Sequence, residues 1–546
     1  MNNTNFLSSF LRERIKIAMI KRKVNMVSLA LALTSSLLVA AWASDSESSA
    51  FEARRRLEQK AEGTKVEGAK KYELWAWGRN NAGQLGVVDL EDRFVPTLVS
   101  VIQGKRVRDL AVGGSDTMES HSLVLMSSNK LYSTGDNSHG QLGLGDDLDR
   151  ESVTPIPKVF SLDFVSVATG ESHSLALTKG GDLYAWGSNQ HGQLGFATAS
   201  GAGSKQTTIP EIISTSIFDG VEETTSKFVG VACGARHSLA WTSTGEIYAW
   251  GSNAFGQLGT GAPQASSSSN NQNSNSNELG EGNPIPTKVK LSTKGAKIVS
   301  VVSGGFHNLM LTEDGNVYAW GNNNHGQLGL GKKNSAPHRV YAPTKMATLD
   351  HVRGMQGSVR KIVAGSTFSV LLTTKGELFG FGDNSALQLG GNAGAGGGGG
   401  GDIFEPTKLF AGAGNQQGLV FKDVSCGKLH CVAAADSNAK GGSSGQVFAW
   451  GTNSYGQLGL GLAVKRSSAS AKPQRVGGIL ENVSVERVVA SATGSYAIST
   501  KGELFAWGKN NAGQLGLRST KNPKSLPEIV VEIDEESTGT LRLSVE

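Results

Sequence analysis

Cysteine is scarce in this chain, with three residues among 546: Cys233, Cys426 and Cys431. A disulfide framework of the kind that holds small secreted domains together needs more cysteines at regular spacings, so none is predicted. Cys233 and Cys426 each precede a glycine in corresponding segments, and we interpret them as small core residues. The spacing of the three does not support a redox or metal-binding role.

Catalytic signatures and a strong charge of either sign are also absent from the sequence. It contains no phosphate-binding Walker loop, no Ser/His/Asp signature and no metalloprotease helix, so no catalytic, cofactor-binding or metal-ligating residues are predicted. The net charge is +5, and the excess of Lys and Arg lies in residues 1–71, leaving the remainder nearly neutral. A large nucleic-acid surface on that remainder is therefore not expected.

Long apolar runs are limited to one, from Val24 to Trp42. A basic cluster precedes it, and a small-x-small segment, 41–43, precedes Ser44. Residues 1–44 therefore resemble a secretory signal peptide, shorter if translation starts at Met19. An uncleaved membrane anchor, an organelle leader, and no targeting role remain open. The first two interpretations place the chain in the secretory pathway or endomembranes, with contact to the membrane if the segment is retained; the others place it in an organelle, the cytoplasm or the nucleus.

Glycine, in contrast, is abundant, with 72 residues, and it recurs in a motif that appears eight times. Its clearest copy is 184–195, Tyr-Ala-Trp-Gly-Ser-Asn-Gln-His-Gly-Gln-Leu-Gly. The glycine after the Trp position recurs in every copy, at Gly78, Gly135, Gly187, Gly251, Gly321, Gly382, Gly451 and Gly508. In each copy Asn follows two positions later and Gln-Leu-Gly completes the motif, which predicts a strand running into a tight turn. Leu387 departs from the pattern, because it replaces a glycine there.

Each copy belongs to a unit of four predicted strands. In the third unit, 164–170 and 173–178 alternate apolar and polar residues, a short turn follows, and 183–186 runs back into the asparagine turn. A fourth strand is marked by proline, which favours an outer edge because it lacks an N–H donor. The eight prolines are Pro96, Pro157, Pro210, Pro286, Pro343, Pro406, Pro473 and Pro527.

These units predict an all-β, seven-bladed β-propeller of four-stranded antiparallel blades, preceded by an apolar leader and a polar stalk. Seven second strands can be counted, starting at His121, His173, His237, His307, Phe368, His430 and Gly494. One aromatic-Trp-Gly strand is then left over. Either 72–78 or 504–508 could close the last blade, and the sequence leaves this open.

The motif Gly-x-Asn-x-x-Gly-Gln-Leu-Gly, together with segments such as Gly170–Leu175, resembles the regulator of chromosome condensation repeat family. The resemblance covers about 72–530 and implies a seven-bladed propeller, but the family hosts several activities on one scaffold. Outside the repeats, 45–71 is predicted as a polar linker, helical or disordered, and 531–546 as a C-terminal tail. Three low-complexity inserts, 262–283, 391–402 and 437–445, are predicted as flexible loops.

The repeated histidines and tryptophans are interpreted as structural, since chemistry is rarely repeated once per blade. The fourth residue after the repeat glycine varies, whereas the Asn before it and the Gln-Leu-Gly after it are constrained, so we expect it to point outward from one rim. We call it the position-four residue of each loop. The candidate partner-binding set comprises His139, His191, Phe255, His325 and Tyr455.

Three functions are compatible with this interpretation. The first is a non-catalytic scaffold that binds another protein through this rim. The second, implied by the resemblance, is a guanine nucleotide exchange factor for a small GTPase of the Ran type or a relative. The third is a tryptophan-based UV-B receptor, but that branch has Gly-Trp-Arg-His-Thr where this chain has 234–238, Gly-Ala-Arg-His-Ser. No cofactor is predicted for any of them.

Overall fold

The structure is a computed structural model of the whole chain. It describes residues 74–103, 105–114, 120–196, 206–214, 218, 227–261, 282–291, 297–331, 337–346, 349, 357–390, 401–409, 419–437, 445–461, 469–501, 503–517, 523–534 and 537–540. The predicted leader 1–44 and the linker 45–71 lie outside these residues, as do almost all of the three predicted inserts. Among the described residues, none of the helices has the length and apolar character needed to span a bilayer.

Seven antiparallel sheets, here called blades 1 to 7, each have four strands in sequential order. Blades 1 and 2 consist of β3 (Val107–Gly113), β4 (His121–Met126), β5 (Leu131–Gly135) and β6 (Arg150–Pro155), then β7 (Phe164–Thr169), β8 (His173–Thr178), β9 (Leu183–Ser188) and β10 (Gln206–Ile213). Blades 3 and 4 consist of β11 (Phe228–Cys233), β12 (His237–Thr242), β13 (Ile247–Gly251) and β14 (Asn283–Lys288), then β15 (Ile298–Ser303), β16 (His307–Thr312), β17 (Val317–Asn322) and β18 (Arg339–Lys345).

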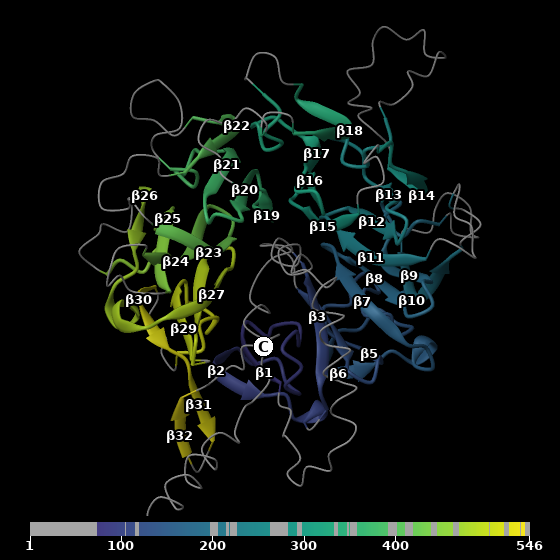
Figure 1. Cartoon of the computed structure of the whole chain (residues 1–546). Helices are drawn as coiled ribbons and strands as arrows, with labels where there is room; N and C mark the ends of the chain where they lie inside the picture. The colour runs from purple at the N-terminus through teal and green to yellow at the C-terminus, as the bar shows by residue number, and fades with distance from the viewer. Residues whose placement is uncertain are drawn as a thin grey trace, which may run out of the picture.

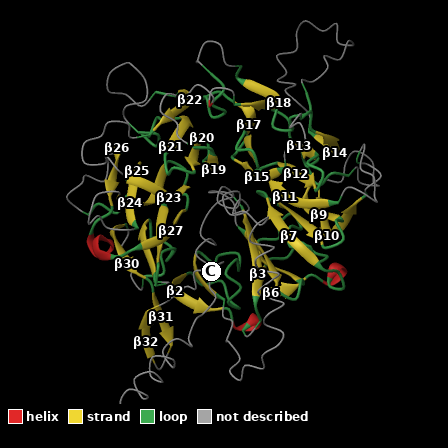
Figure 2. Ribbon diagram, in the orientation of Figure 1, coloured by secondary structure: helices red, strands yellow, loops and turns green. Residues whose placement is uncertain are grey.

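Blades 5 to 7 continue the same order. Blade 5 consists of β19 (Val359–Ala364), β20 (Phe368–Thr373), β21 (Leu378–Gly382) and β22 (Ile403–Lys408). Blade 6 consists of β23 (Leu419–Cys426), β24 (His430–Ser437), β25 (Gln446–Gly451) and β26 (Ser470–Arg475). Blade 7 consists of β27 (Val485–Ala490), β28 (Gly494–Ser499), β29 (Leu504–Gly508) and β30 (Lys524–Ile529). The blades stand around a central axis, which confirms the predicted seven-bladed propeller (Figures 1 and 2).

The leftover strand is β1 (Trp75–Gly78), which pairs with β2 (Arg93–Leu98) in a separate two-stranded sheet. Figure 1 shows this sheet between blade 7 and blade 1. One apolar cluster joins all three, with Trp77 from β1, Tyr496 from blade 7 and Val124 from blade 1. The 504–508 strand is the third strand of blade 7, so the two candidates for closure occupy different sheets.

The predicted hairpins form because alternating residues meet a glycine turn. In blade 2, His173 pairs with Gly187 and Leu177 with Leu183, so 178–182 forms the turn. Seven of the eight marker prolines lie in the outermost strand of their sheet, where a missing N–H costs little. The prediction was wrong for Pro157, which starts the short 3-10 helix η3 (Pro157–Val159) after β6 because its ring suits the first turn of a helix.

Two further short helices lie outside the blades, η2 (Ser100–Ile102) and η7 (Gly478–Asn482). The segment predicted as a C-terminal tail, 531–546, contains two paired strands, β31 (Val531–Asp534) and β32 (Ser537–Thr540). Figure 1 shows this hairpin projecting beyond blade 7, close to β2.

Candidate partner-binding rim

Eight loops built alike define one rim of the propeller, which we call the asparagine-loop rim. They follow β1, β5, β9, β13, β17, β21, β25 and β29. The blades share one strand order, so the loops after their third strands lie on the same side of the ring. The rim also contains the loops that join the first and second strands of each blade.

The repeated Asn and Gln hold each loop in one conformation. The Asn Oδ1 accepts a hydrogen bond from the backbone N–H of the Leu five residues later, at 2.8–3.2 Å in all eight loops. The Gln Oε1 accepts one from the N–H of the position-four residue, at 2.8–3.0 Å. The backbone under each position-four side chain is therefore fixed by hydrogen bonds that do not involve that side chain.

The position-four side chains are not equally accessible. His139, His191, Phe255 and His325 are half-buried, and Tyr455 is 37% exposed. The corresponding alanines after β1 and β29, Ala82 and Ala512, are buried. The five candidate residues thus lie on blades 1 to 4 and on blade 6. Blade 5 has the half-buried Ala386 instead, and the buried alanines lie on blade 7 and on the β1–β2 sheet.

Several of these side chains contact the next blade around the ring. The Phe255 ring lies 4.9 Å from the Phe306 ring, and the Arg339 guanidinium is 5.6 Å from its centroid. The Lys509 ammonium is 5.0 Å from the Tyr455 ring. At two junctions the rim therefore presents an aromatic ring beside a cation, with attraction between them on the order of 0.5–1 kcal/mol at exposed sites.

His191 stands beside an ion pair that also crosses a junction. Arg236 Nε lies 3.1 Å from Glu171 Oε2. The pKa of His191 is lowered mainly by partial burial and then by Arg236, while Glu171 opposes the shift. His191 is accordingly a neutral imidazole at neutral pH.

His325 is the candidate that meets carboxylates. Its Nδ1 lies 3.1 Å from Asp402 Oδ2. Asp383, in the next asparagine loop, offers a third ligand atom, and the three atoms lie within 4.8 Å of one another. This cluster could hold a metal ion, which the sequence did not predict because Asp402 is the last residue of the glycine-rich insert 391–402.

Inside the ring, the hairpin histidines connect neighbouring blades. Each Nε2 lies 3.0–3.1 Å from the residue after the second-strand start of the next blade: His121 to Ser174, His173 to Ser238, His237 to Asn308, His307 to Ser369 and His430 to Ser495. Each of these partners donates to a loop glutamine carbonyl, so it must accept from Nε2–H. Burial lowers the histidine pKa values to about 3–4. The structural interpretation is confirmed, since these rings stay neutral and satisfied at Nε2.

The repeated tryptophans are also structural, as predicted. Trp186, Trp250, Trp320, Trp450 and Trp507 are fully buried, and each Nε1 donates to a loop glutamine carbonyl at 2.8–3.0 Å. In several loops the same carbonyl also accepts a hydrogen bond from the serine that is bonded to the histidine of the preceding blade. Blade-to-blade contact is therefore specified at the glutamine of every such loop.

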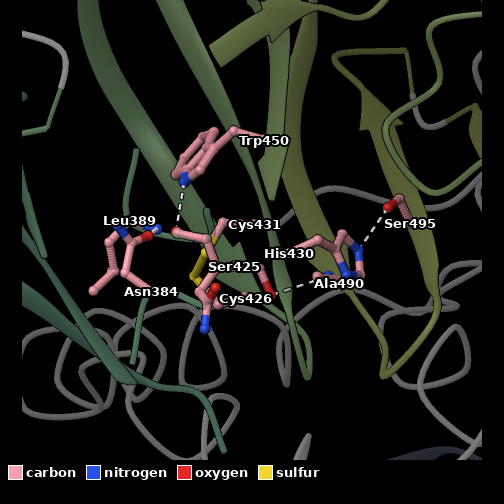
Figure 3. The surroundings of a disulfide bond; sticks show 10 residues. Asn384, Leu389, Ser425, Cys426, His430, Cys431, Trp450, Ala490 and Ser495 are labelled. Atoms are coloured by element: carbon pink, nitrogen blue, oxygen red, sulfur yellow. Dashed lines mark hydrogen bonds between the residues drawn. A yellow bond between two sulfur atoms is a disulfide. The ribbon is translucent and has the colours of Figure 1, made fainter. Parts of the chain in front are cut away.

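Blade 6 contains a disulfide that the sequence analysis missed. Cys426 ends β23 and Cys431 follows the start of β24, and the antiparallel register places them opposite one another in an S–S bond (Figure 3). The interpretation of Cys426 as a small core residue missed its bond to Cys431, although both are buried. The hairpin register of the other blades was the signal that could have found the pair. Cys233 remains a free cysteine, with its thiol pKa raised by burial.

Comparison with known proteins supports the fold. The family model for the RCC1-like domain matches residues 73–438, and that for the regulator of chromosome condensation (RCC1) repeat matches 444–498 and 501–537. The crystal structure of human WBSCR16 superimposes with a TM-score of 0.51 at 23% identity, covering 73% of this chain and 93% of that one. Prp20p from Saccharomyces cerevisiae gives a TM-score of 0.51 at 22% identity, covering 76% and 92%.

Curated relatives match over most of the chain. The ultraviolet-B receptor UVR8 of Arabidopsis thaliana is 30% identical over 395 residues, which are 72% of this chain and 76% of the receptor. The human E3 ubiquitin-protein ligase HERC2 is 30% identical over 438 residues, 78% of this chain but 8% of the ligase. The chain belongs to the family of RCC1-like β-propellers.

Proposed function

We propose that this protein is a non-catalytic scaffold that binds another protein through the asparagine-loop rim. One observation carries the proposal: eight loops share a fixed backbone, and five of their position-four residues carry varied aromatic and imidazole side chains. Aromatic residues on rigid supports are enriched among the residues that dominate protein–protein binding, because little side-chain entropy is lost on contact. The buried histidines, held neutral between blades, support a structural rather than a catalytic role.

The chemistry of the rim indicates what such a partner would offer. Phe255 beside Arg339 and Tyr455 beside Lys509 present apolar surface next to positive charge. A partner segment with a carboxylate flanking an apolar side chain would meet both groups at once. Burying a ring of this kind contributes about 1.5–3 kcal/mol.

The test compares three forms of the full chain. The rim variant carries His191→Ala, Phe255→Ala and Tyr455→Ala. The control carries Lys179→Ala and Lys375→Ala, exposed residues in turns between second and third strands and hence on the opposite rim. A partner identified with the wild type should bind the rim variant at least about tenfold more weakly and the control unchanged. Equal dissociation constants for all three would contradict the proposal, provided that their unfolding midpoints agree.

Guanine nucleotide exchange is the alternative. Prp20p is a protein described as binding Gsp1p and histones, but its likeness to this chain, at 22% identity, concerns the fold alone. Exchange predicts that the purified chain accelerates nucleotide release from a small GTPase in a panel. If nucleotide release is unchanged for every GTPase in the panel, exchange activity is contradicted and the scaffold function remains.

Ultraviolet reception has less support, in spite of the relative UVR8. In the described part of the chain the tryptophans lie in strands, and Ala235 occupies the loop position where that branch has Trp. Light sensing predicts a dimer that dissociates under ultraviolet light. A mass in solution that does not change with illumination would contradict it.

The compartment proposed for the protein is the secretory pathway. The leader-like residues 1–44 support this, and so does the Cys426–Cys431 disulfide, because such bonds persist in oxidising compartments. A C-terminally tagged full-length chain should be found in endomembranes or the medium, with Ser44 as its N-terminus if the leader is cleaved. A cytosolic chain that retains Met1 would contradict this localisation.

A further inference from the structure

We propose that His325, Asp383 and Asp402 form a binding site for a divalent transition-metal ion at the junction of blades 4 and 5. One ligand atom from each lies within 4.8 Å of the other two. The inference is independent of the proposed scaffold function, since it concerns a ligand that the rim would bind without any partner.

The three residues come from three segments that the fold brings together. His325 is the position-four residue of the loop after β17, Asp383 opens the loop after β21, and Asp402 immediately precedes β22. The first two loops have the fixed backbone of all the asparagine loops, with the His325 and Leu389 N–H groups bonded within them. A site mounted on such supports loses little entropy when an ion binds.

The Asp383 carboxylate does not bond the glutamine of its own loop, which is a second and independent observation. In the loop after β5, the corresponding Asp136 accepts a hydrogen bond from Gln141 Nε2 at 2.7 Å. Both aspartates accept from a backbone N–H two residues later, Asp136 from Ser138 and Asp383 from Ser385, each at 2.9 Å. The second oxygen of Asp383, however, accepts from Thr367 Oγ1 at 3.1 Å and not from a glutamine.

The glutamine of the Asp383 loop, Gln388, corresponds to Gln141, and its side-chain amide is buried. Gln388 is 0% exposed, and its Nε2 has no hydrogen-bond partner in the described part of the chain. An orphaned buried donor costs about 1–3 kcal/mol. The Asp383 carboxylate thus forgoes a bond that Asp136 makes and stands beside His325, where a bound cation would offset that loss.

The donor set defines the class of ion. One imidazole nitrogen and two carboxylates suit zinc and the neighbouring divalent ions such as cobalt, whereas calcium prefers oxygen ligands alone. A tetrahedral zinc with bonds of about 2.0–2.2 Å separates its ligand atoms by roughly 3.4 Å. The His325–Asp402 pair, at 3.1 Å, is already near that spacing, and the third ligand needs a side-chain movement on the order of 1 Å.

A simple ion pair between His325 and Asp402 is the competing explanation. The two side chains are 44% and 26% exposed, and a pair at that exposure contributes at most about 1 kcal/mol. It does not account for the position of Asp383. Three ligands would leave at least one coordination position for water.

The rim supplies its own control. His139 and His191 occupy the same loop position as His325, but the next loops have Ser188 and Ser252 where blade 5 has Asp383. These two histidines therefore lack the corresponding carboxylate, and we assign no metal to them.

The experiment titrates Zn²⁺ alone, and Co²⁺ alone as a spectroscopic probe, into the full chain. We compare wild type with His325→Ala, Asp383→Asn and the control His139→Ala. Wild type and control should bind with the same affinity and give the visible absorption of four- or five-coordinate Co²⁺. The other two variants should bind at least about tenfold more weakly and lose that absorption.

Two results would overturn the proposal: no binding by wild type at millimolar Zn²⁺, or equal affinity and equal absorption in wild type and His325→Ala. The unfolding midpoint measured without metal shows whether each variant is folded. It should rise on addition of Zn²⁺ in wild type and His139→Ala and stay unchanged in His325→Ala and Asp383→Asn.

Discussion

At the scale of single residues, the histidine bond is missing at two of the seven blade junctions: blade 7 starts its second strand with Gly494, and between blades 5 and 6 both partners are replaced. Blade 5 starts its second strand with Phe368, which has no polar atom to donate. The residue that would receive it in blade 6 is Cys431, where other blades have serine or asparagine. Cys431 is bonded to Cys426, so no hydroxyl is left buried without a partner. Donor and acceptor have been replaced together.

The buried histidines predict that stability falls in acid. Their folded pKa values, about 3–4, lie below the ordinary 6.5, so the unfolded chain binds more protons as the pH drops. Stability is complete above about pH 6.5 and decreases below it, by ~2 kcal/mol per histidine at pH 5. Urea midpoints at pH 7.5 and 5.0 measure the loss. His430→Phe, which copies Phe368, should reduce that loss by about one histidine's share, and an unchanged difference would contradict the assignment.

The serines that accept hydrogen bonds from the buried histidines lead to a second prediction about stability. Ser238→Ala leaves the buried His173 Nε2–H without its acceptor and removes one of the two donors to the Gln193 carbonyl. We expect destabilisation by about 1–3 kcal/mol, measured by urea unfolding at pH 7.5. Ser454→Ala, in an exposed loop position, is the control and should stay within about 0.5 kcal/mol of wild type. Equal stability of the two variants would show that the hydrogen bond makes no net contribution to the free energy of unfolding.

At the scale of elements, the asparagine loop requires a positive φ at its fifth position. Seven loops have glycine there, and the eighth has Leu387 at φ 60°. A residue with a side chain destabilises the fold by roughly 1–2 kcal/mol when its backbone adopts this conformation. Glycine avoids that strain but destabilises the fold by about 0.5–1 kcal/mol, because it loses more conformational freedom on folding. Leu387→Gly should therefore stabilise the protein by up to ~1 kcal/mol in urea unfolding.

The reverse change should be far worse at a regular loop. A Cβ added at Gly192 would lie 2.6 Å from the Pro284 Cα atom, so Gly192→Leu meets both strain and a backbone clash. Destabilisation of both variants would show that Leu387 makes contacts that outweigh its backbone strain.

The Cys426–Cys431 bond links two paired strands across a very short loop. The chain-entropy estimate for so short a loop is about 2 kcal/mol. Cys426→Ala combined with Cys431→Ala should lower the unfolding free energy by no more than this. Alkylation of the unfolded, unreduced protein should label only Cys233. Labelling of all three cysteines before reduction would show that the bond does not form.

At the scale of the whole molecule, the sequence predicts what repeats and misses what occurs once. The hairpin 173–187 follows from alternation and a glycine turn, and the other blades repeat the same pairing. The disulfide depends on a register that only pairing reveals. The proximity of His325 to Asp402 depends on 77 residues of chain that include four strands and an insert. The separate β1–β2 sheet depends on how the ring closes, which no local pattern contains.

Ring closure gives the last prediction. The β1–β2 sheet fills the gap between blades 7 and 1 with two strands, and Trp77 Nε1 is buried without a hydrogen-bond partner in the described part of the chain. In the regular junction between blades 1 and 2, Trp186 Nε1 donates to Gln141. The junction between blades 7 and 1, here called the seam, should therefore open at a lower free energy than the other blade junctions.

Native-state hydrogen exchange measures this opening directly. Amides of β1 that pair with β2 should exchange with a lower opening free energy than those of β9, although both strands carry a buried Trp. Trp77→Ala, expected to cost about 3–5 kcal/mol, should release the seam before the rest of the ring unfolds. Equal protection of β1 and β9 in wild type would mean that the propeller opens as one unit and that two strands close the ring as firmly as four.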